Sequence, residues 1–388
     1  MKYKQYNGGH NYKMSEFNYS EVLDIKDIKS NINFWLVRSK GGAFYDEFKN
    51  EEYIALGWNY IDSKNIYESN EEKLKDIKSE IERIYKNKQG GAIFNKCDRF
   101  INEMHEGDIV MVPSSENNEI LFATVGDYYE QDQDYIHELE IINRIDSKED
   151  YGIEIKCPYK KRRKIMPIKT IKGERLNPNL FRALTSYHGI SNINKYSDFV
   201  LSSIYNLYVR NNKLNMVVNI EQKDGIDGYD FSSLIYNICK MAKISDSNVR
   251  VTTQANVNSP GDVNNIIETA NNIFDFIKDN WIGILMMYGA FCGVKIGPIQ
   301  INSFIEFIIK SINSKKEIEH KEALTEGVLL DNKIKEFELE IKKSNWNDEK
   351  LRKAKEIAND IEKSATSLRV DKESSSRVIK VDFKTNDE

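Results

Sequence analysis

The pattern of apolar and polar positions in the first third of the chain predicts short strands that alternate with amphipathic helices. Apolar runs at residues 34–39 (FWLVRS) and 53–58 (YIALGW) predict two strands, with a short helix between them around residues 44–49. In residues 71–88 (EEKLKDIKSEIERIYKNK), apolar side chains recur at helical spacing with charges between them. This spacing predicts a surface helix that covers one side of a sheet, and the segment AIFNKCDRFINEM continues the same period.

A β-hairpin is predicted within residues 107–130. Two apolar runs, Ile109–Val112 and Ile120–Val125, are separated by a polar loop of Ser, Glu and Asn, which is the pattern of two paired strands. The next two segments, IHELEIINRI and YGIEIKCPY, alternate in the same way and predict two further strands. Strand, turn, strand, helices and a four-strand meander together indicate a small mixed β-barrel capped by helices, so the expected fold class is α+β.

The spacing of apolar and polar residues changes after the barrel. Residues 176–210 predict two apolar helices, joined by Gly189, that close the first domain, and the polar stretch after them marks a boundary. Beyond it we predict a helix at FSSLIYNICKMAKI, a strand at NVRVTTQANV, and a helix at VNNIIETANNIFDFIKD after a turn at residues 259–262. The expected parts are an N-terminal arm (1–30), the barrel with its closing helices (31–210), an α-rich domain (225–369) and a disordered tail (370–388).

The most apolar segment of the chain is residues 281–299 (WIGILMMYGAFCGVKIGPI), and it permits two structures. Its glycines recur at four-residue spacing, which in lipid lets helices approach closely, and its length is just enough to span a bilayer. However, Lys295 lies inside the segment and Pro298 ends it. GVKIGPIQI also fits a tight hairpin after a shorter buried helix, and we favour this buried element over a membrane span.

Charge and cysteine content restrict the classes of function. With 388 residues the chain is long enough for two cores. Its formal net charge of -5 argues against nucleic-acid binding by overall charge, because such binding depends on counterion release at a basic surface. The four cysteines lie far apart without a C-x-x-C pair, which disfavours a zinc cluster and a disulfide framework. The first residues lack the apolar core of a secretory signal, so we expect a cytoplasmic protein. A cofactor is not expected.

Four segments of the first half resemble a known family. FWLVRSKGGAFYDEF, YIALGW, GDIVMVPS and ILFATVGDYYE together resemble the PUA-like domains related to the EVE group, in particular the version at the N-terminus of Mrr-type restriction endonucleases and other phage-defence proteins. The resemblance covers roughly residues 30–190. It implies a domain that holds a modified or extruded base in an aromatic pocket, and a setting in bacterial defence against phage or foreign nucleic acid.

Such a pocket needs an aromatic face to replace the lost stacking, and polar groups for the edge of the base. Aromatic residues of these segments can supply the face, and polar residues near them can supply the hydrogen bonds. The base-binding set that we predict is Trp35, Arg38, Trp58, Asp62, Ser114, Asp127, Tyr128 and Tyr129. For each large aromatic residue, a place in the barrel core is an equally good interpretation, since such side chains dominate cores.

The segment KCPYKKRRKIMPIK is the most basic short run of the chain. Phosphate contacts need a local cluster of this kind, and they position nucleic acid without reading its sequence. We therefore predict phosphate contacts from Lys160, Lys161, Arg162 and Arg163. The alternative is a solvated loop or an edge strand protected by its charge.

Two rival functions stay open. Glu154 and Lys156 in YGIEIKC superficially match the carboxylate and lysine of a metal-dependent nuclease, but a further carboxylate at the usual span is missing, so an enzyme is disfavoured and neither catalytic nor metal residues are assigned. The second rival is a membrane-active effector. The expected function is recognition of a modified or extruded base, coupled to a C-terminal domain that signals or oligomerises. The expected partners are nucleic acid and, through the C-terminal helices, a second copy or another protein.

Overall fold

The computed structural model describes residues 23–68, 70–147, 155–186, 188–222, 225–255, 261–291, 294–296, 299–301, 344, 346–371 and 378–379. The fold is α+β, and the chain divides into two compact units. The N-terminal unit comprises residues 28–206 and 255–264, and the C-terminal unit comprises the described residues of 1–27, 207–254 and 265–388.

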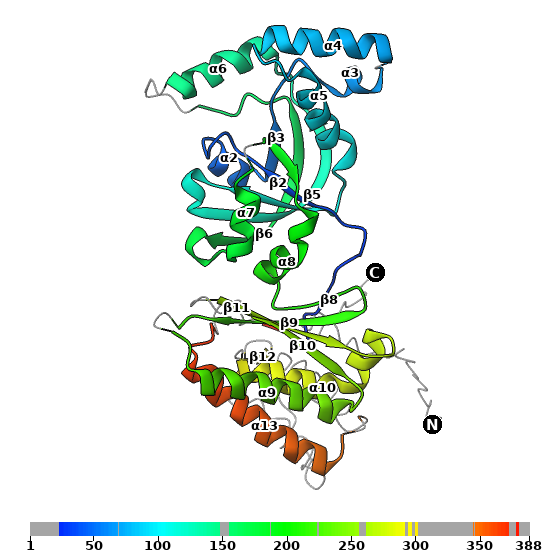
Figure 1. Ribbon diagram of the computed structural model, residues 1–388, viewed down its shortest axis with the longest axis vertical. Coiled ribbons are helices and arrows are strands. Elements are labelled where there is room, and N and C mark those ends of the chain that lie inside the picture. Colours follow the sequence, from blue (N-terminus) through cyan, green and yellow to red (C-terminus); the bar gives the residue numbers. More distant parts are fainter. Residues whose placement is uncertain are drawn as a thin grey trace, which may run out of the picture. The chain divides into compact units, whose positions relative to one another are not determined.

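The N-terminal unit is built on a six-stranded sheet with the order β3-β6-β5-β4-β2-β7. The strands are β2 (Phe34–Val37), β3 (Tyr53–Leu56), β4 (Ile109–Pro113), β5 (Glu119–Glu130), β6 (Lys161–Lys172) and β7 (Ile190–Asn192). β2 and β4 run parallel, and the other neighbours are antiparallel. The long pair β5 and β6 has two shifts of register. Such irregularities increase the local twist, and the sheet curls into a half-barrel (Figure 1).

Helices surround this sheet. They are α2 (Tyr45–Asn50), α3 (Ser63–Tyr67), α4 (Glu71–Ile84), α5 (Gly90–Asp98) with the π-helical turn η1 (Arg99–Glu103), α6 (Tyr135–Ser147), α7 (Pro178–Leu184) and α8 (Ser197–Ile204). In Figure 1, α3 to α6 gather at one end of the sheet. The core between sheet and helices contains the fully buried side chains of Trp35, Phe48 and Phe100.

The structure confirms several elements predicted for this unit and corrects others. The first two strands, the helices within 44–49 and 71–88, and the hairpin of β4 and β5 are present. The prediction of a strand at IHELEIINRI is wrong, because these residues lie in α6. Glu138, Ile141 and Ile145 face the core at helical spacing, so the segment carries both periods. Around Gly189 a short strand, β7, separates α7 from α8.

The C-terminal unit combines a five-stranded sheet with three long helices. The sheet has the order β1-β8-β9-β11-β10, with β1 (Lys26–Asp27), β8 (Leu207–Arg210), β9 (Lys213–Ile220), β10 (Arg250–Ala255) and β11 (Gly261–Glu268). The helices α9 (Gly228–Ser245), α10 (Ile273–Phe291) and α13 (Asp348–Ser367) lie on one face of this sheet (Figure 1). A second, three-stranded sheet contains β13 (Ile299–Ile301), β12 (Val294–Ile296) and β14 (Val378–Ile379) in that order.

Three findings in this unit differ from the sequence interpretation. Residues 261–268 form β11, so the helix predicted to begin there begins only at Ile273. The stretch interpreted as a polar boundary contains β9, whose residues are mostly buried. Part of the expected N-terminal arm, Lys26–Asp27, pairs parallel with β8, whereas residues 1–22 and most of the expected tail lie outside the described residues.

The apolar segment at residues 281–299 has the structure of the hairpin alternative. It forms the second half of α10 and then β12 and β13, which pair antiparallel. Gly293 and Gly297 of the glycine pattern lie outside the described residues. Within the part of the chain that the structure describes, helices that are both long and apolar enough to cross a bilayer are absent.

Candidate functional site

The loop after β3 carries an aromatic side chain on an unusual backbone. This loop, residues 57–61, is called the Trp58 loop below. Trp58 has a φ of 61° and a half-buried side chain. The left-handed region costs a residue with a Cβ atom roughly 1–2 kcal/mol, and bulky residues adopt it only where the surroundings enforce it. Contacts with neighbouring residues must therefore hold the loop in this conformation.

Glu138, from α6, holds the loop on one side. Its Oε1 accepts a hydrogen bond from the Trp58 backbone N–H at 2.6 Å, and its Oε2 accepts one from the Asn59 N–H at 2.7 Å. The Tyr85 hydroxyl also donates to Oε2, at 2.9 Å. Glu138 is 4% exposed. Burial raises the pKa of its carboxyl group above the ordinary value, and the hydrogen bonds from Asn59 and Trp58 offset this only in part.

Lys161, from the start of β6, holds the loop on the other side. Its side chain is fully buried, and its Nζ donates to the backbone carbonyl oxygens of Trp58 at 2.9 Å and Ile61 at 2.7 Å. Gly57 allows the close approach of α6, because a Cβ atom there would lie 2.7 Å from Glu138 Oε1 and 2.9 Å from a ring carbon of Tyr159. The backbone around Trp58 is thus fixed by buried polar contacts on both sides.

The Trp58 indole has two close neighbours, the ammonium group of Lys96 and the backbone of Gly189. Lys96 Nζ, from α5, lies 5.3 Å from the ring centroid, a distance at which a cation is attracted to the aromatic face. Burial lowers the pKa of the Lys96 ammonium group. Gly189 also lies close to the ring, because a Cβ atom built there would be 3.5 Å from Trp58 Cη2, an ordinary van der Waals distance.

A network of charged and hydroxyl groups continues from the loop. Asp62 caps α3 through the Asn65 N–H and forms an ion pair with Lys160 at 2.9 Å. Lys160 also lies 3.6 Å from Glu130, whose Oε1 accepts a hydrogen bond from the Tyr128 hydroxyl at 2.6 Å. Asp62 and Tyr128 of the predicted base-binding set are therefore linked by contacts through Lys160 and Glu130, and Trp58 lies four positions before Asp62 in the chain.

The other predicted base-binding residues have different places. Trp35 is 1% exposed, and its Nε1 donates to Asp108 at 2.8 Å, so it is a core residue and its ring is closed to a base. Arg38 donates to the carbonyl oxygens of Ser186 and Leu184 and ties β2 to the segment after α7. Ser114 accepts a hydrogen bond from the Glu119 N–H, at the end of β5 opposite to Glu130.

Asp127 and Tyr129 lie near the network without joining it. Asp127 is exposed at the register shift between Val125 and Tyr128. Tyr129 is half-buried and pairs with Arg162 across β5 and β6. Because side chains alternate along a strand, Tyr129 points to the face opposite to Tyr128. Of the eight predicted residues, Asp62 and Tyr128 thus share one network of contacts, and Trp58 lies on the loop that leads to Asp62.

The basic run does not form a solvent-facing phosphate surface. Lys161, Arg162 and Arg163 are 0%, 8% and 5% exposed. Arg162 donates to the carbonyl oxygens of Tyr159 and Cys157, and its guanidinium carbon lies 4.3 Å from the Tyr53 ring centroid. Arg163 donates to the carbonyl oxygens of Phe100 and Ile101. These three cations bind backbone carbonyl oxygens within the N-terminal unit. The positive charges that suggested phosphate binding are thus explained by contacts with backbone carbonyl oxygens inside the fold. Of the four predicted residues, Lys160 alone is partly exposed, with 22% of its side chain accessible.

Three residues of the site were missed by the sequence interpretation. Glu138 was placed on a predicted strand, and a helical interpretation of the same segment would have shown it on the apolar stripe of α6. Lys96 and Glu130 carried no signal, because a lysine in a helix and a glutamate at a strand end are common surface residues. The carboxylate of the nuclease alternative, Glu154, lies outside the described residues, and Lys156 is exposed.

Comparison with known proteins identifies one similarity. Residues 35–170 match the model of a family described as a domain of unknown function (DUF8426). The matched region runs from β2 into β6, and it contains the Trp58 loop together with Glu138, Lys96 and Lys161. The comparisons with curated proteins and with solved structures find no match.

Proposed function

We propose that the N-terminal unit is a PUA-like domain that recognises a modified or extruded base in nucleic acid, with the Trp58 indole as its stacking surface. The observation that carries this proposal is a half-buried indole on a left-handed backbone, fixed from both sides by Glu138 and Lys161. Costly backbone conformations that are over-determined by their surroundings cluster at binding sites. A stacking surface that is rigid before binding also loses little entropy on binding.

The neighbouring groups suit the remaining parts of a nucleotide. Asp62, Lys160 and Glu130 supply donors and acceptors for the edge of a base, and they are already oriented by one another. Within the described part of the chain, Lys96 forms no ion pair with a carboxylate, and its ammonium group lies beside the indole. We assign the phosphate contact to Lys96 in place of the buried run at residues 161–163.

The wider role follows from the family resemblance. A domain of this kind in a cytoplasmic bacterial defence protein would sense foreign nucleic acid and pass the signal to the C-terminal unit, which would signal or oligomerise. The N-terminal location of the recognition domain and the separate compact C-terminal unit are compatible with this division of labour.

The test uses the copurifying nucleic acid and one variant. The wild-type protein and Trp58→Ala are purified in parallel, bound nucleic acid is digested to nucleosides, and mass spectrometry identifies any nucleoside enriched by the wild type. A short single-stranded oligonucleotide with that nucleoside is then titrated by fluorescence anisotropy. We expect Trp58→Ala to weaken binding by about 1–3 kcal/mol, the contribution of one stacked base.

A matched control separates stacking from general loss of an aromatic side chain. Tyr67, on α3, is 69% exposed, and Tyr67→Ala should bind like the wild type. Equal affinity of wild type and a folded Trp58→Ala protein, or the same nucleosides enriched by both, would contradict the proposal.

A further inference from the structure

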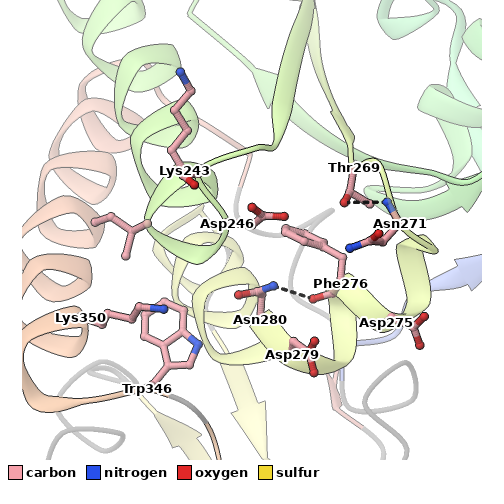
Figure 2. Close-up of a pocket in the computed structure, with 12 residues that line it drawn as sticks. Lys243, Asp246, Thr269, Asn271, Asp275, Phe276, Asp279, Asn280, Trp346 and Lys350 are labelled. Atoms are coloured by element: carbon pink, nitrogen blue, oxygen red, sulfur yellow. Dashed lines mark hydrogen bonds between the residues drawn. The ribbon is translucent and has the colours of Figure 1, made fainter.

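A cavity of about 490 Å³ opens in the C-terminal unit, and the site described above does not use it. It lies where α9 ends, α10 begins and α13 begins (Figure 2). Its volume is within the range of small-molecule sites, which are usually apolar at the base and carry a few polar groups. The chemistry of its walls indicates what class of ligand it would take.

Two aromatic side chains and the Asn280 amide line the base of the cavity. Phe276 and Trp346 are 5% and 7% exposed. Asn280, which is 7% exposed, interrupts α10 with a φ of -123° and a ψ of 15°. Its Nδ2 donates to the Phe276 carbonyl oxygen at 3.0 Å. Among the described residues its Oδ1 has no partner, and Figure 2 shows this oxygen on the side of Trp346. An accessible amide oxygen of this kind can accept a hydrogen bond from a ligand that brings a donor.

The rim adds carboxylates that lack cationic partners. Asp246, Asp275 and Asp279 line the cavity, and in the described part of the chain none of them forms an ion pair. Asp246 accepts one hydrogen bond from the Asn248 N–H at 2.9 Å. Of the two lysines that line the cavity, Lys243 extends along α9 away from it, and Lys350 lies beside Trp346 (Figure 2). Acceptors therefore outnumber donors around the cavity.

This distribution decides between the classes of ligand. A phosphate or carboxylate ligand would face three carboxylates, and an apolar ligand would displace water from the Asn280 oxygen without replacing its hydrogen bond. A bare divalent cation would make no use of the two aromatic rings. An organic ammonium ion satisfies all three features, because its N–H groups reach the carboxylates and the Asn280 oxygen while its carbon chain covers the rings, whose faces also attract the cation.

We propose that this cavity binds an aliphatic amine with more than one ammonium group, that is, a diamine or polyamine. Asp279 and Asp275 hold one ammonium group at the rim, Asp246 and Asn280 hold the other further in, and Trp346 packs against the carbon chain. The residues of this site belong to the C-terminal unit, and the proposal is independent of base recognition by the Trp58 loop.

Isothermal titration calorimetry of the full-length protein with putrescine tests the proposal, at a fixed ionic strength. Saturable binding is expected, whereas the neutral diol of the same chain length should give no binding. Asp279→Asn should weaken putrescine binding at least about tenfold, which is the loss of one charge-assisted hydrogen bond. Asp275→Asn serves as a second variant, and circular dichroism checks that both are folded.

Two controls make the result decisive. Glu356 is an exposed carboxylate on α13 outside the cavity, and Glu356→Gln should bind putrescine like the wild type. Trp58→Ala should also leave putrescine binding unchanged, so that failure here is distinct from failure of base recognition. Binding of the diol with similar affinity, displacement of putrescine by equimolar Mg²⁺, or equal weakening by Glu356→Gln would each overturn the proposal.

Discussion

The carboxylate of Glu138 accepts a hydrogen bond from the Trp58 backbone N–H at 2.6 Å, although the two residues are 80 positions apart in the chain. The second oxygen of the same carboxylate binds the N–H of Asn59. Two adjacent amides that point at one carboxylate fix the peptide plane before Trp58, and so they favour the left-handed backbone that presents the indole. Helix α6 thereby determines the position of a side chain on a loop after β3.

Replacement of Glu138 tests this relationship. Glu138→Gln keeps the shape of the side chain but turns one acceptor into a donor that faces a backbone N–H. We expect the free energy of unfolding in urea to fall by about 1–3 kcal/mol, the cost of a buried unsatisfied group, and oligonucleotide binding to weaken with it. Glu140→Gln, at an exposed position of the same helix, should change neither. An unchanged stability of Glu138→Gln would show that the carboxylate does not hold the loop.

The basic run of β6 gives a second prediction, because two lysines of this strand have opposite environments. Lys161 is fully buried and binds two carbonyl oxygens of the Trp58 loop, whereas Lys164 is exposed. Lys161→Met should lower the free energy of unfolding by about 1.5–3 kcal/mol, since it removes hydrogen bonds from a charged group. Lys164→Met should stay within about 0.5 kcal/mol of the wild type. Chemical denaturation of both variants measures the difference, and similar values for the two would contradict the assignment.

The sequence was sufficient for the local elements of the N-terminal unit. The continuous apolar runs of β2, β3 and β4 report strands that are buried on both faces, and the helical spacing of Ile77 and Ile81 in α4 reports burial on one face. The apolar pattern fails where the buried side chains are charged. Lys161, Arg162 and Arg163 look like a surface run, yet both sides of β6 are covered there, and their charges bind backbone carbonyl oxygens.

The site could be predicted only in part for a related reason. Trp58 and Asp62 lie in one loop, so the sequence places them together, but Trp35 and Trp58 have the same chemistry and only the fold separates core from loop. Contacts between distant segments, such as Glu138 with Trp58 or Lys160 with Glu130, depend on strand order and helix packing. A single sequence does not contain that information in any local pattern.

The network of Asp62, Lys160 and Glu130 predicts a pH dependence. Burial opposes ionisation of both carboxyl groups, but the hydrogen bonds they accept and the Lys160 charge outweigh it, and the pKa of each lies below its ordinary value. A carboxyl group with a lowered pKa in the folded state stabilises the fold above its unfolded pKa of about 4. This stabilisation is lost as the pH falls through the lower, folded-state pKa.

Lys160→Met isolates this contribution. At neutral pH the variant should be less stable than the wild type by about 0.2–1 kcal/mol, the range for partly exposed ion pairs, and the difference should shrink as the pH falls from 6 toward 3. Urea unfolding of both proteins across this range measures it, with Lys164→Met as the control that should show a constant difference. A gap that widens on acidification would reverse the sign and refute the assigned pairing.

The left-handed backbone of Trp58 can be tested apart from any ligand. Trp58→Ala and Trp58→Gly both remove the indole, so they differ only in the Cβ atom. At a φ of 61° that atom is unfavourable, and the glycine variant should be more stable than the alanine variant by about 0.5–1 kcal/mol, after allowance for the greater freedom of glycine in the unfolded chain. The same pair of substitutions at Lys75, an exposed position inside α4, should show the opposite order by about 1 kcal/mol. Urea unfolding of the four variants gives both differences, and alanine exceeding glycine at both positions would mean that the backbone at residue 58 is ordinary and that the loop is not held as described.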